Sequence, residues 1–587
     1  MTKASIFYAI LLSCIAFSRL TTASAANSTN STTPTNSTTT TNSTRQWTFA
    51  EIPPSKHVLT WYSCYDDFLC AVLEVPLNYQ NPKEGRSLVP LINYPAKKTP
   101  YKGMILVNPG GPGISGVDLI RSLATQNISF FGLDYDFVSW DPRGCGYAIP
   151  AGDCALTNLT IPLGPASLVQ RRDLDKIHGP SLPEQYFENV YNVAYELGQE
   201  CTNSIGGPLD SGPHMSSTTI ARDMLSIVDA YANSWRGQNC EDDASLLNYW
   251  GMSYGTFIGQ VFASLFPHRV GRVVLDGVLD PDQISKQSGL NMVNQADEAF
   301  STLFLYCHLA GPKLCPFYTG TTAHDIYLRF ENIITQLNVT QALEQNWTNS
   351  TAMWVVLQGL KGTFYTYTYH AIDNFPIAAL ILTAIETLVP NITLEAVENL
   401  EKELPPPINP PLTINDTWST GTACADNGGR YIGQPLGEWA DAIQVMENES
   451  WLSGESQIVN QMFCAGWNIT TAEHYGGPFG GDTKHPILFV SNTVDPITPI
   501  MNGQKGTRIF KDAQLLTNEA VGHTTLPTQN ACALAKIGAF LINGTLPGTD
   551  NYCPLEAGPW GVLANGTLSE LLEAADLSGV MRKLGRK

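Results

Sequence analysis

The sequence has little positive charge. Its 587 residues include 33 Lys and Arg against 53 Asp and Glu, so the formal net charge is −20, and charged residues make up only 15% of the chain. Because nucleic-acid binding depends on basic side chains that neutralise phosphates, no nucleic acid is expected as a partner. An acidic surface favours solubility but specifies no substrate. The 43% hydrophobic residues suffice for one large domain with an insertion, or for two domains.

Patterns that bind metals are also missing. The 13 cysteines show neither paired CxxC motifs nor the Cys/His spacing of a zinc site, so neither a metal nor a cofactor is expected. Without Cys14, which falls in an N-terminal leader, twelve cysteines form an even set that suits an oxidising compartment. Spacing does not determine the pairing, but three close pairs suggest local disulfides: Cys64/Cys70, Cys307/Cys315 and Cys532/Cys553.

Long apolar runs are absent as well. The N-terminal run Ile6–Phe17 is too short to span a membrane; Lys3 precedes it and a small-residue cleavage site, Ala23–Ala25, follows it. Residues 1–25 are therefore predicted to be a signal peptide. The longest later run, Ile377–Ala384, is shorter still, and no apolar C-terminal tail suggests a lipid anchor. We expect a secreted, extracellular protein without a stable membrane anchor.

Glycosylation sequons support an exported chain. Residues 26–46 are rich in Ser, Thr and Asn and cannot bury a core, so they are predicted to be a disordered, glycosylated tail. A single sequon is often unused, but this many are hard to reconcile with a cytosolic protein. They begin at Asn27, Asn30, Asn36, Asn42, Asn127, Asn158, Asn338, Asn346, Asn349, Asn391, Asn415, Asn448, Asn468, Asn543 and Asn565.

The stretch Ser245–Gly255 contains a Gly-x-Ser-x-Gly pattern in an informative setting. Leu246–Trp250 has strand character and Thr256–Phe266 is compatible with a helix, so Ser253 falls on a sharp turn between the two. The flanking glycines remove Cβ atoms where the turn is crowded, which allows a strained, exposed serine at the helix N-terminus. There the helix dipole and a free N–H favour negative charge on a substrate. The bare pattern also occurs by chance, but this setting indicates a nucleophile.

A loop rich in glycine and proline, Pro109–Gly116, follows the apolar strand predicted at Gly103–Asn108. Such a loop lets backbone N–H groups approach a ligand, which suggests an oxyanion loop, although a plain tight turn has the same composition. Two further strands, Asp136–Trp140 and Arg272–Asp276, also end in turns that contain glycine. Together with helices such as Thr218–Tyr231, they predict a doubly wound, mostly parallel sheet, which binds ligands at the C-terminal ends of its strands.

Residues 282–482 differ from this pattern. They contain an amphipathic helix at Asp325–Leu337, many aromatic residues and a proline-rich segment, Pro405–Pro411. We interpret them as a mainly helical insertion that covers the sheet edge as a lid, with aromatics that belong mostly to its own core. The sheet would then be built from residues 47–281 and 483–587.

An acid and a base follow the insertion. A serine hydroxyl needs a base such as an imidazole, and a carboxylate on the other ring nitrogen holds the tautomer and stabilises the imidazolium. Asp495 follows the strand predicted at Pro486–Asn492, and His523 follows the next short strand, Gln514–Thr517. Asp495 could also be a turn former and His523 an ordinary surface histidine. Asp276 and Asp280, which follow another strand, are rival acids.

Several segments together resemble the secreted tripeptidyl aminopeptidases, α/β-hydrolase peptidases related to the prolyl aminopeptidases. The segments are NPGGPGISG, DPRGCG, HMSSTTIARDM, YWGMSYGTFIGQVFASLFPHRVGRVVLDGVLDP and SNTVDPITP…GH, and they spread through nearly the whole mature chain. Prolyl aminopeptidases have a His before their Gly-Gly-Pro-Gly, whereas this chain has Pro109, so the tripeptidyl group is the better match.

The resemblance implies an α/β-hydrolase fold with a mainly helical lid. It makes Ser253 the nucleophile, Asp495 the orienting acid and His523 the base, with the backbone N–H groups of Gly111 and Tyr254 as the oxyanion hole and Gly110 as a less certain neighbour. We therefore expect a secreted serine exopeptidase that acts on peptides or small acyl substrates and releases short peptides, tripeptides above all, from free N-termini.

Three other readings of the sequence stay open: a prolyl aminopeptidase, an esterase or other acyl hydrolase, and an inactive binding protein on the same fold. An aminopeptidase also needs a carboxylate for the substrate ammonium group; Asp297, Glu298 and Asp426 are available, although each could be a solvated surface charge. The sequence specifies neither the peptide preference nor the oligomeric state.

Overall fold

The computed structural model describes residues 45–125, 134–154, 182–286, 291–337, 350–393, 395–396, 399–400 and 416–584. The predicted signal peptide (1–25), nearly all of the predicted tail (26–46) and Pro405–Pro411 lie outside these residues. Ten predicted sequons also lie outside them: Asn27, Asn30, Asn36, Asn42, Asn127, Asn158, Asn338, Asn346, Asn349 and Asn415.

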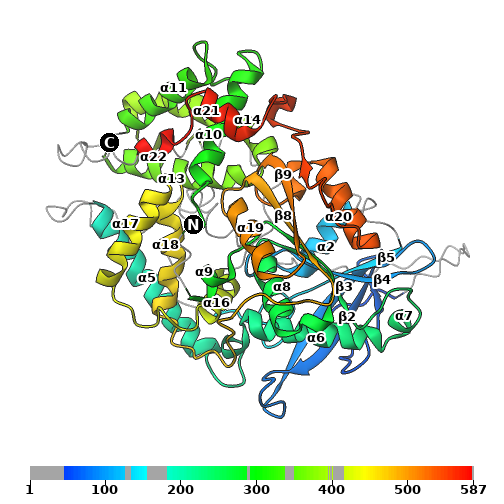
Figure 1. The fold of residues 1–587 in the computed structure, drawn as a ribbon. Coiled ribbons are helices and arrows are strands. Elements are labelled where there is room, and N and C mark those ends of the chain that lie inside the picture. The colour runs from blue at the N-terminus through cyan, green and yellow to red at the C-terminus, as the bar shows by residue number, and fades with distance from the viewer. Residues whose placement is uncertain are drawn as a thin grey trace, which may run out of the picture.

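A ten-stranded sheet runs through one half of the molecule (Figure 1), in the order β1-β2-β3-β5-β4-β6-β7-β8-β9-β10. The first three strands and the β3–β5 pair are antiparallel, and all pairs from β5 to β10 are parallel, which confirms the mostly parallel sheet. The strands are β1 (Tyr62–Cys64), β2 (Phe68–Pro76), β3 (Arg86–Tyr94), β4 (Gly103–Asn108), β5 (Tyr135–Trp140), β6 (Leu247–Met252), β7 (Val270–Asp276), β8 (Ile487–Val494), β9 (Gln514–Val521) and β10 (Tyr552–Cys553).

The central strands are recognisable in the sequence because they are buried on both faces. Every residue of β4, β5 and β6 is buried, as expected for parallel strands covered on two sides. In contrast, β3 lies outside the predicted strands because Pro90 stands in its middle, and proline cannot donate to a strand ladder. In the structure Pro90 lies opposite Val72 of β2, and its carbonyl accepts the N–H of Asp141 at 3.2 Å.

Helices cover both faces of the sheet. On one face α6 (Ser217–Ala232), α8 (Tyr254–Leu265) and α19 (Ile500–Ile509) share a hydrophobic cluster with the strands, and on the other face α2 (Gly116–Thr125) and α20 (Ala531–Asn543) do so. Short elements outside the residues between β7 and β8 include α7 (Trp235–Gln238), η4 (Gly212–His214), η5 (Pro267–Arg269), η9 (Leu526–Thr528) and η10 (Pro559–Gly561). The result is a three-layer α/β/α arrangement.

The described residues between β7 and β8 form helices and no strand; we call this segment the helical insertion. It contains α9 (Pro281–Lys286), α10 (Ala296–Ala310), α11 (Ala323–Gln336), α13 (Ser350–Tyr369), α14 (Ala371–Leu388), η6 (Val389–Asn391), α16 (Asp416–Asp426), η7 (Leu436–Trp439), α17 (Ala440–Glu449), α18 (Gly454–Met462) and η8 (Phe463–Ala465). Its hydrophobic core extends beyond residues 282–482. It includes α5 (Leu182–Ile205) from the first part of the chain and α21 (Leu568–Ala574) and α22 (Val580–Leu584) from the last, which Figure 1 shows beside α18 and α10.

Within the described residues, one helix is long and apolar enough to cross a membrane by length and composition, Ala371–Asn391, which comprises α14 and η6. The apolar run Ile377–Ala384, which alone looked too short, lies inside it. Half of the most apolar window is buried inside the protein, and Phe375, Ala378 and Leu382 are among its buried residues. The helix therefore contributes apolar side chains to the core of the helical insertion.

Five disulfides connect the described cysteines. All three suggested local pairs form, and two longer bridges, Cys154–Cys201 and Cys424–Cys464, join segments that are distant in the sequence. The even set is not fully paired, because Cys145 and Cys240 are free. Cys145 is buried, and this burial raises the pKa of its thiol well above the ordinary value of 9.0.

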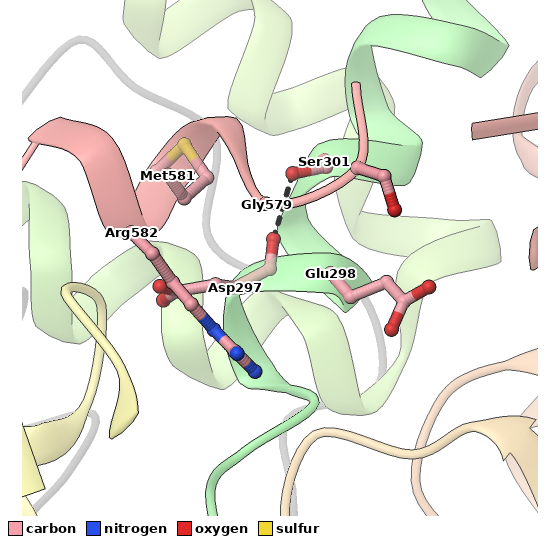
Figure 2. A pocket seen from close by; sticks show the side chains of 7 residues that line it. Asp297, Glu298, Ser301, Gly579, Met581 and Arg582 are labelled. Atoms are coloured by element: carbon pink, nitrogen blue, oxygen red, sulfur yellow. Dashed lines mark hydrogen bonds between the residues drawn. The ribbon is translucent and has the colours of Figure 1, made fainter. Parts of the chain in front are cut away.

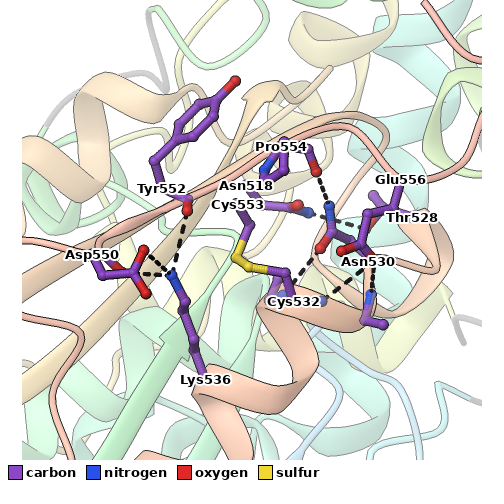
Figure 3. The surroundings of a disulfide bond; sticks show 12 residues. Asn518, Thr528, Asn530, Cys532, Lys536, Asp550, Tyr552, Cys553, Pro554 and Glu556 are labelled. Carbon is purple, nitrogen blue, oxygen red and sulfur yellow. Dashed lines mark hydrogen bonds and ion pairs between the residues drawn. A yellow bond between two sulfur atoms is a disulfide. The ribbon is translucent and has the colours of Figure 1, made fainter.

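The Cys532–Cys553 bridge fastens the end of the sheet (Figure 3). It joins α20 to β10, and the side chain of Asn530 both caps α20, by accepting the N–H of Ala533 at 3.0 Å, and donates to the carbonyl of Pro554 at 2.7 Å. Lys536 of the same helix donates to the carbonyl of Asp550 at 2.6 Å. These contacts hold the segment after α20 against the sheet.

Candidate active site

Ser253 lies on a sharp turn between β6 and α8. Its backbone has φ +52° and ψ −121°, a strained conformation for a residue with a side chain, which typically costs about 1–3 kcal/mol. The turn is fixed from both sides, because the Ser253 N–H donates to the carbonyl of Asp276 at 2.9 Å and its own carbonyl accepts the N–H and hydroxyl of Thr256 at 2.8 and 2.6 Å. A Cβ on Gly251 would meet the carbonyl oxygen of Gly255 at 2.6 Å, so the glycine at 251 is required by close packing.

The loop after β4 lies directly against this turn. Gly110 has φ +89°, and a Cβ there would lie 2.4 Å from the carbonyl oxygen of Met252 and 2.6 Å from the nitrogen of Tyr254. The N–H of Gly110 donates to the side chain of Asn108 at 2.9 Å, so it is occupied. Across the described residues, neither Gly111 nor Tyr254 donates its backbone N–H to another protein group. Asn108, which orients the loop, was not singled out in the sequence.

The structure brings Asp495 and His523 together. The Nδ1 atom of His523 lies 3.1 and 3.0 Å from the two carboxylate oxygens of Asp495, which is fully buried. The same carboxylate accepts the N–H groups of Ile497 and Thr498 at 3.0 and 2.8 Å, and that of Thr524 at 3.3 Å. The hydroxyl of Thr498 also lies 3.2 Å from His523 Nδ1. The predicted acid and base are thus paired, and Thr498 is an additional contact that the sequence did not indicate.

The other ring nitrogen of His523, Nε2, is buried and has no hydrogen-bond partner. Ser253 and His523 form no hydrogen bond in this structure, and catalytic contacts are often long before substrate binds. The two residues nevertheless share one neighbourhood at the end of β7. Asp276 binds the Ser253 N–H, and a Cβ on the next residue, Gly277, would lie 3.3 Å from Cε1 of His523.

Neither rival acid binds the imidazole. The carboxylate of Asp276 accepts the N–H of Thr525 at 3.0 Å and its hydroxyl at 3.0 Å, and burial raises the pKa of Asp276 to about 7. Asp280 forms an ion pair with Lys505 at 2.6 Å. No group of three or more metal-ligating side chains occurs within the described parts of the chain.

Two family models match parts of this chain. A family model described as "alpha/beta hydrolase fold" matches residues 103–400, just over half of the chain, and one described as "TAP-like protein" matches residues 450–553. The chain belongs to the α/β-hydrolase family. The first match includes Ser253, and the second includes Asp495 and His523.

Three known proteins show which members of the family this hydrolase resembles. The tripeptidyl aminopeptidase of Streptomyces coelicolor is 29% identical over 245 residues, which cover 40% of this chain and 40% of that protein. The serine protease Hip1 of Mycobacterium tuberculosis is 23% identical over 513 residues, 83% of this chain and 87% of that protein. Carboxylesterase B of the same organism is 24% identical over 495 residues, 82% of this chain and 86% of that protein. The hydrolase is thus tripeptidyl aminopeptidase-like, although it aligns with well under half of the Streptomyces protein.

The helical insertion of this hydrolase touches His523 directly. The backbone carbonyl of Tyr369, at the end of α13, accepts the backbone N–H of His523 at 3.1 Å. The two side-chain rings meet edge to face, with centroids 5.0 Å apart. A Cβ on Gly522 would lie 3.1 Å from the same carbonyl oxygen. His370 follows, and burial together with the nearby charge of His523 lowers its pKa to about 4, although Asp373 opposes this shift. The α13–α14 junction therefore forms one wall beside His523.

The three carboxylates considered for a substrate ammonium group have different surroundings. Asp297 is buried and accepts bonds from Ser450 and from the N–H groups of Trp451 and Leu452 at 2.7–3.0 Å. Glu298 is partly exposed, and its carboxylate makes no hydrogen bond to another described residue. Figure 2 shows both beside a pocket of about 310 Å³ between α10 and α22; its lining residues are Asp297, Glu298, Ser301, Ser578, Gly579, Met581 and Arg582, and none belongs to the predicted triad.

Asp426 is the third of these carboxylates, and it is neither solvated nor open to a ligand. It is 1% exposed and is bound by Ser217 and by the hydroxyl of Tyr254. Tyr254 immediately follows Ser253, so this contact links the helical insertion to the turn that carries the serine.

Proposed function

We propose that this α/β-hydrolase is an exported serine exopeptidase that releases tripeptides from the free N-termini of peptides. The observation that carries the proposal is the Asp495–His523 pair at 3.0 Å, with His523 Nε2 buried and unpartnered, beside a serine in a strained turn. A carboxylate on Nδ1 leaves Nε2 unprotonated and able to accept a proton, which is what activation of a serine requires.

The proposed reaction is acyl transfer in two steps. Ser253 Oγ attacks the scissile carbonyl carbon while His523 Nε2 takes its proton, and the N–H groups of Gly111 and Tyr254 hold the oxyanion. The intermediate then expels the leaving amine, which receives that proton from His523. Water, deprotonated by the same nitrogen, adds to the acyl-enzyme and releases the N-terminal peptide with Ser253 restored.

The similarity to the Streptomyces tripeptidyl aminopeptidase and to the serine protease Hip1 supports peptides as substrates. Export is supported by the five disulfides, together with the leader and sequons predicted from the sequence. The strand-end position of Ser253, Asp495 and His523 agrees with the rule that such sheets bind ligands at the C-terminal ends of their strands.

A peptide library with free and with acetylated N-termini tests the proposal. We expect tripeptides to be released from free N-termini only, and we expect Ser253→Ala to reduce the rate by at least about 10⁴-fold and to abolish labelling by a fluorophosphonate. His523→Ala should lose activity to a similar extent. Labelling that persists in Ser253→Ala would contradict the assignment of the nucleophile.

An esterase is the second candidate, because carboxylesterase B covers most of this chain and the triad itself does not distinguish an amide from an ester. Hydrolysis of simple acyl esters without release of any peptide would favour it. A wild-type chain that takes no fluorophosphonate label would instead point to an inactive binding protein.

A further inference from the structure

A buried carboxylate of the helical insertion reaches the residue after the candidate nucleophile. The hydroxyl of Tyr254 donates to Oδ2 of Asp426 at 2.7 Å, and Ser217 donates its N–H to Oδ1 at 2.7 Å and its hydroxyl to Oδ2 at 2.6 Å. Asp426 is 1% exposed and Ser217 is fully buried. Three donors on one buried carboxylate make a network whose bonds are stronger than those between neutral groups.

Asp426 is itself held firmly in place. It is the last residue of α16, and Cys424, two residues earlier, is joined to Cys464 of η8. The backbone carbonyl of Asp426 lies 2.8 Å from Nε2 of His474. Ser217 begins α6, so the carboxylate also lies at a helix N-terminus, where negative charge is favoured. Asp426 is therefore a fixed acceptor.

Tyr254 connects Asp426 to the backbone at the start of α8. It is the first residue of α8, its side chain is 5% exposed, and its ring packs edge-on against Phe257 at 5.6 Å. The nitrogen of Tyr254 faces the loop at Gly110, where a Cβ would approach it to 2.6 Å. The ring of Tyr254 is thus held at its body by Phe257 and at its hydroxyl by Asp426.

We propose that Asp426 is a positioning residue for the oxyanion hole: by holding the Tyr254 hydroxyl, it aims the Tyr254 backbone N–H at the developing oxyanion and couples the helical insertion to the reaction. The proposal rests on the serine-hydrolase function proposed above. It assigns to Asp426 no contact with substrate.

The charge of Asp426 gives this role a pH dependence. Burial raises its pKa to about 6, against the opposing effect of the bonds from Ser217 and Tyr254 and of the charge of His474. Other charged groups on the elements packed against α16 have their own partners: Asp223 with Arg143, Arg222 with Glu473, Asp229 with Arg269, Asp282 with Lys286 and Lys505, and His214 with the Pro208 carbonyl. When the pH falls below about 6, Asp426 becomes neutral and Tyr254 loses its charged acceptor.

Two variants test the proposal, Asp426→Asn and Tyr254→Phe. The first keeps the shape of the carboxyl group but not its charge, and the second removes only the hydroxyl. The readout is the second-order rate of fluorophosphonate labelling from pH 5 to pH 8, which reports attack by Ser253 without a peptide substrate. At pH 8 we expect each variant to react about tenfold more slowly than wild type, less than the ~100-fold cost of deleting an oxyanion donor outright.

The ratio of wild-type to variant rate is the decisive quantity, because effects of pH that both proteins share cancel in it. For Asp426→Asn we expect this ratio to fall towards one below about pH 6, where Asp426 is neutral in wild type. For Tyr254→Phe it should also fall but stay above one, because a neutral carboxyl group still accepts from the hydroxyl. We also expect the double variant to react about as slowly as either single variant, since both remove the same interaction. A ratio that is flat with pH, or variants that label at the wild-type rate, would overturn the proposal.

Asp297→Asn is the matched control, because Asp297 is also a buried carboxylate of the insertion that accepts hydrogen bonds from three donors. None of these donors is Tyr254. It should label at the wild-type rate, and an equal loss there would assign the effect to general loosening and overturn the proposal. If Asp426→Asn does not fold, Tyr254→Phe carries the test alone. If the wild-type chain takes no label, both the proposed function and this inference are wrong. If wild type is labelled and the variants are labelled at the same rate, only this inference is wrong.

Discussion

Three buried carboxylates surround the candidate site, and their hydrogen-bond partners give each a different position. Asp495 binds the imidazole of His523, Asp276 binds the N–H and hydroxyl of Thr525, and Asp426 binds the Tyr254 hydroxyl. All three are at most 1% exposed. Burial raises the pKa of Asp276 and that of Asp426, because a low dielectric disfavours the charged form. The environment of each carboxylate, and not its residue type, therefore decides its behaviour.

Asp276→Asn should change how stability depends on pH. Burial raises the pKa of Asp276 from 3.8 to about 7, so the folded chain binds this proton more tightly than the unfolded chain. The stability that this group contributes is therefore greatest below about pH 4 and is lost as the pH rises through 7. Thermal unfolding from pH 4 to pH 8 should show the Tm of wild type falling relative to that of Asp276→Asn. A constant difference in Tm across this range would contradict the prediction.

At the scale of helices and strands, local patterns were predictable and distant contacts were not. The apolar strand before Ser253, the glycine loop after β4 and the turns carrying Asp495 and His523 each appear in a short window of sequence. Whether a carboxylate is solvated or buried depends on chain segments far away, and Asp426 is 172 residues from Tyr254. No periodicity or spacing connects two such residues, so this contact could only be found in the folded chain.

The α13–α14 junction contacts His523, a contact that the sequence did not predict. Tyr369→Leu removes the ring that packs against His523 at 5.0 Å, while the backbone carbonyl that accepts the His523 N–H remains. We expect fluorophosphonate labelling to slow by several-fold to about tenfold, because a less constrained imidazole spends less time in the productive orientation.

Tyr367→Leu provides the comparison for this variant. Tyr367 is 5% exposed and lies two residues earlier in the same helix, whereas Tyr369 is only partly buried, so the loss of Tyr367 should cost at least as much packing. Thermal unfolding should show at least as large a loss of stability for Tyr367→Leu, and only Tyr369→Leu should slow labelling. Equal rates for the two variants would show that the ring of Tyr369 does not position His523.

For the molecule as a whole, the helical insertion touches both ends of the candidate catalytic machinery. Asp426 reaches the residue after Ser253, and Tyr369 reaches His523. The insertion is in turn tied to the first and last parts of the chain, because α5, α21 and α22 share its hydrophobic core. A change in the packing of this core is therefore expected to shift the contacts that Asp426 and Tyr369 make with the candidate site.

The same whole-molecule organisation predicts the thiol content of the protein. Of 13 cysteines in the sequence, ten form the five disulfides and two, Cys145 and Cys240, are free, while Cys14 belongs to the predicted leader. Denaturation with N-ethylmaleimide should add two alkyl groups to the chain without its predicted leader, and prior reduction should raise the number to twelve, as intact mass would show after removal of glycans. Thirteen groups after reduction would mean that the leader is retained. No reaction before reduction would mean that Cys145 and Cys240 pair with each other. The two thiols have separate environments, which argues against such a pair. Cys145 is buried beside Asp141, whereas Cys240 donates to the carbonyls of Gly237 and Asp242 at 3.2 and 3.3 Å.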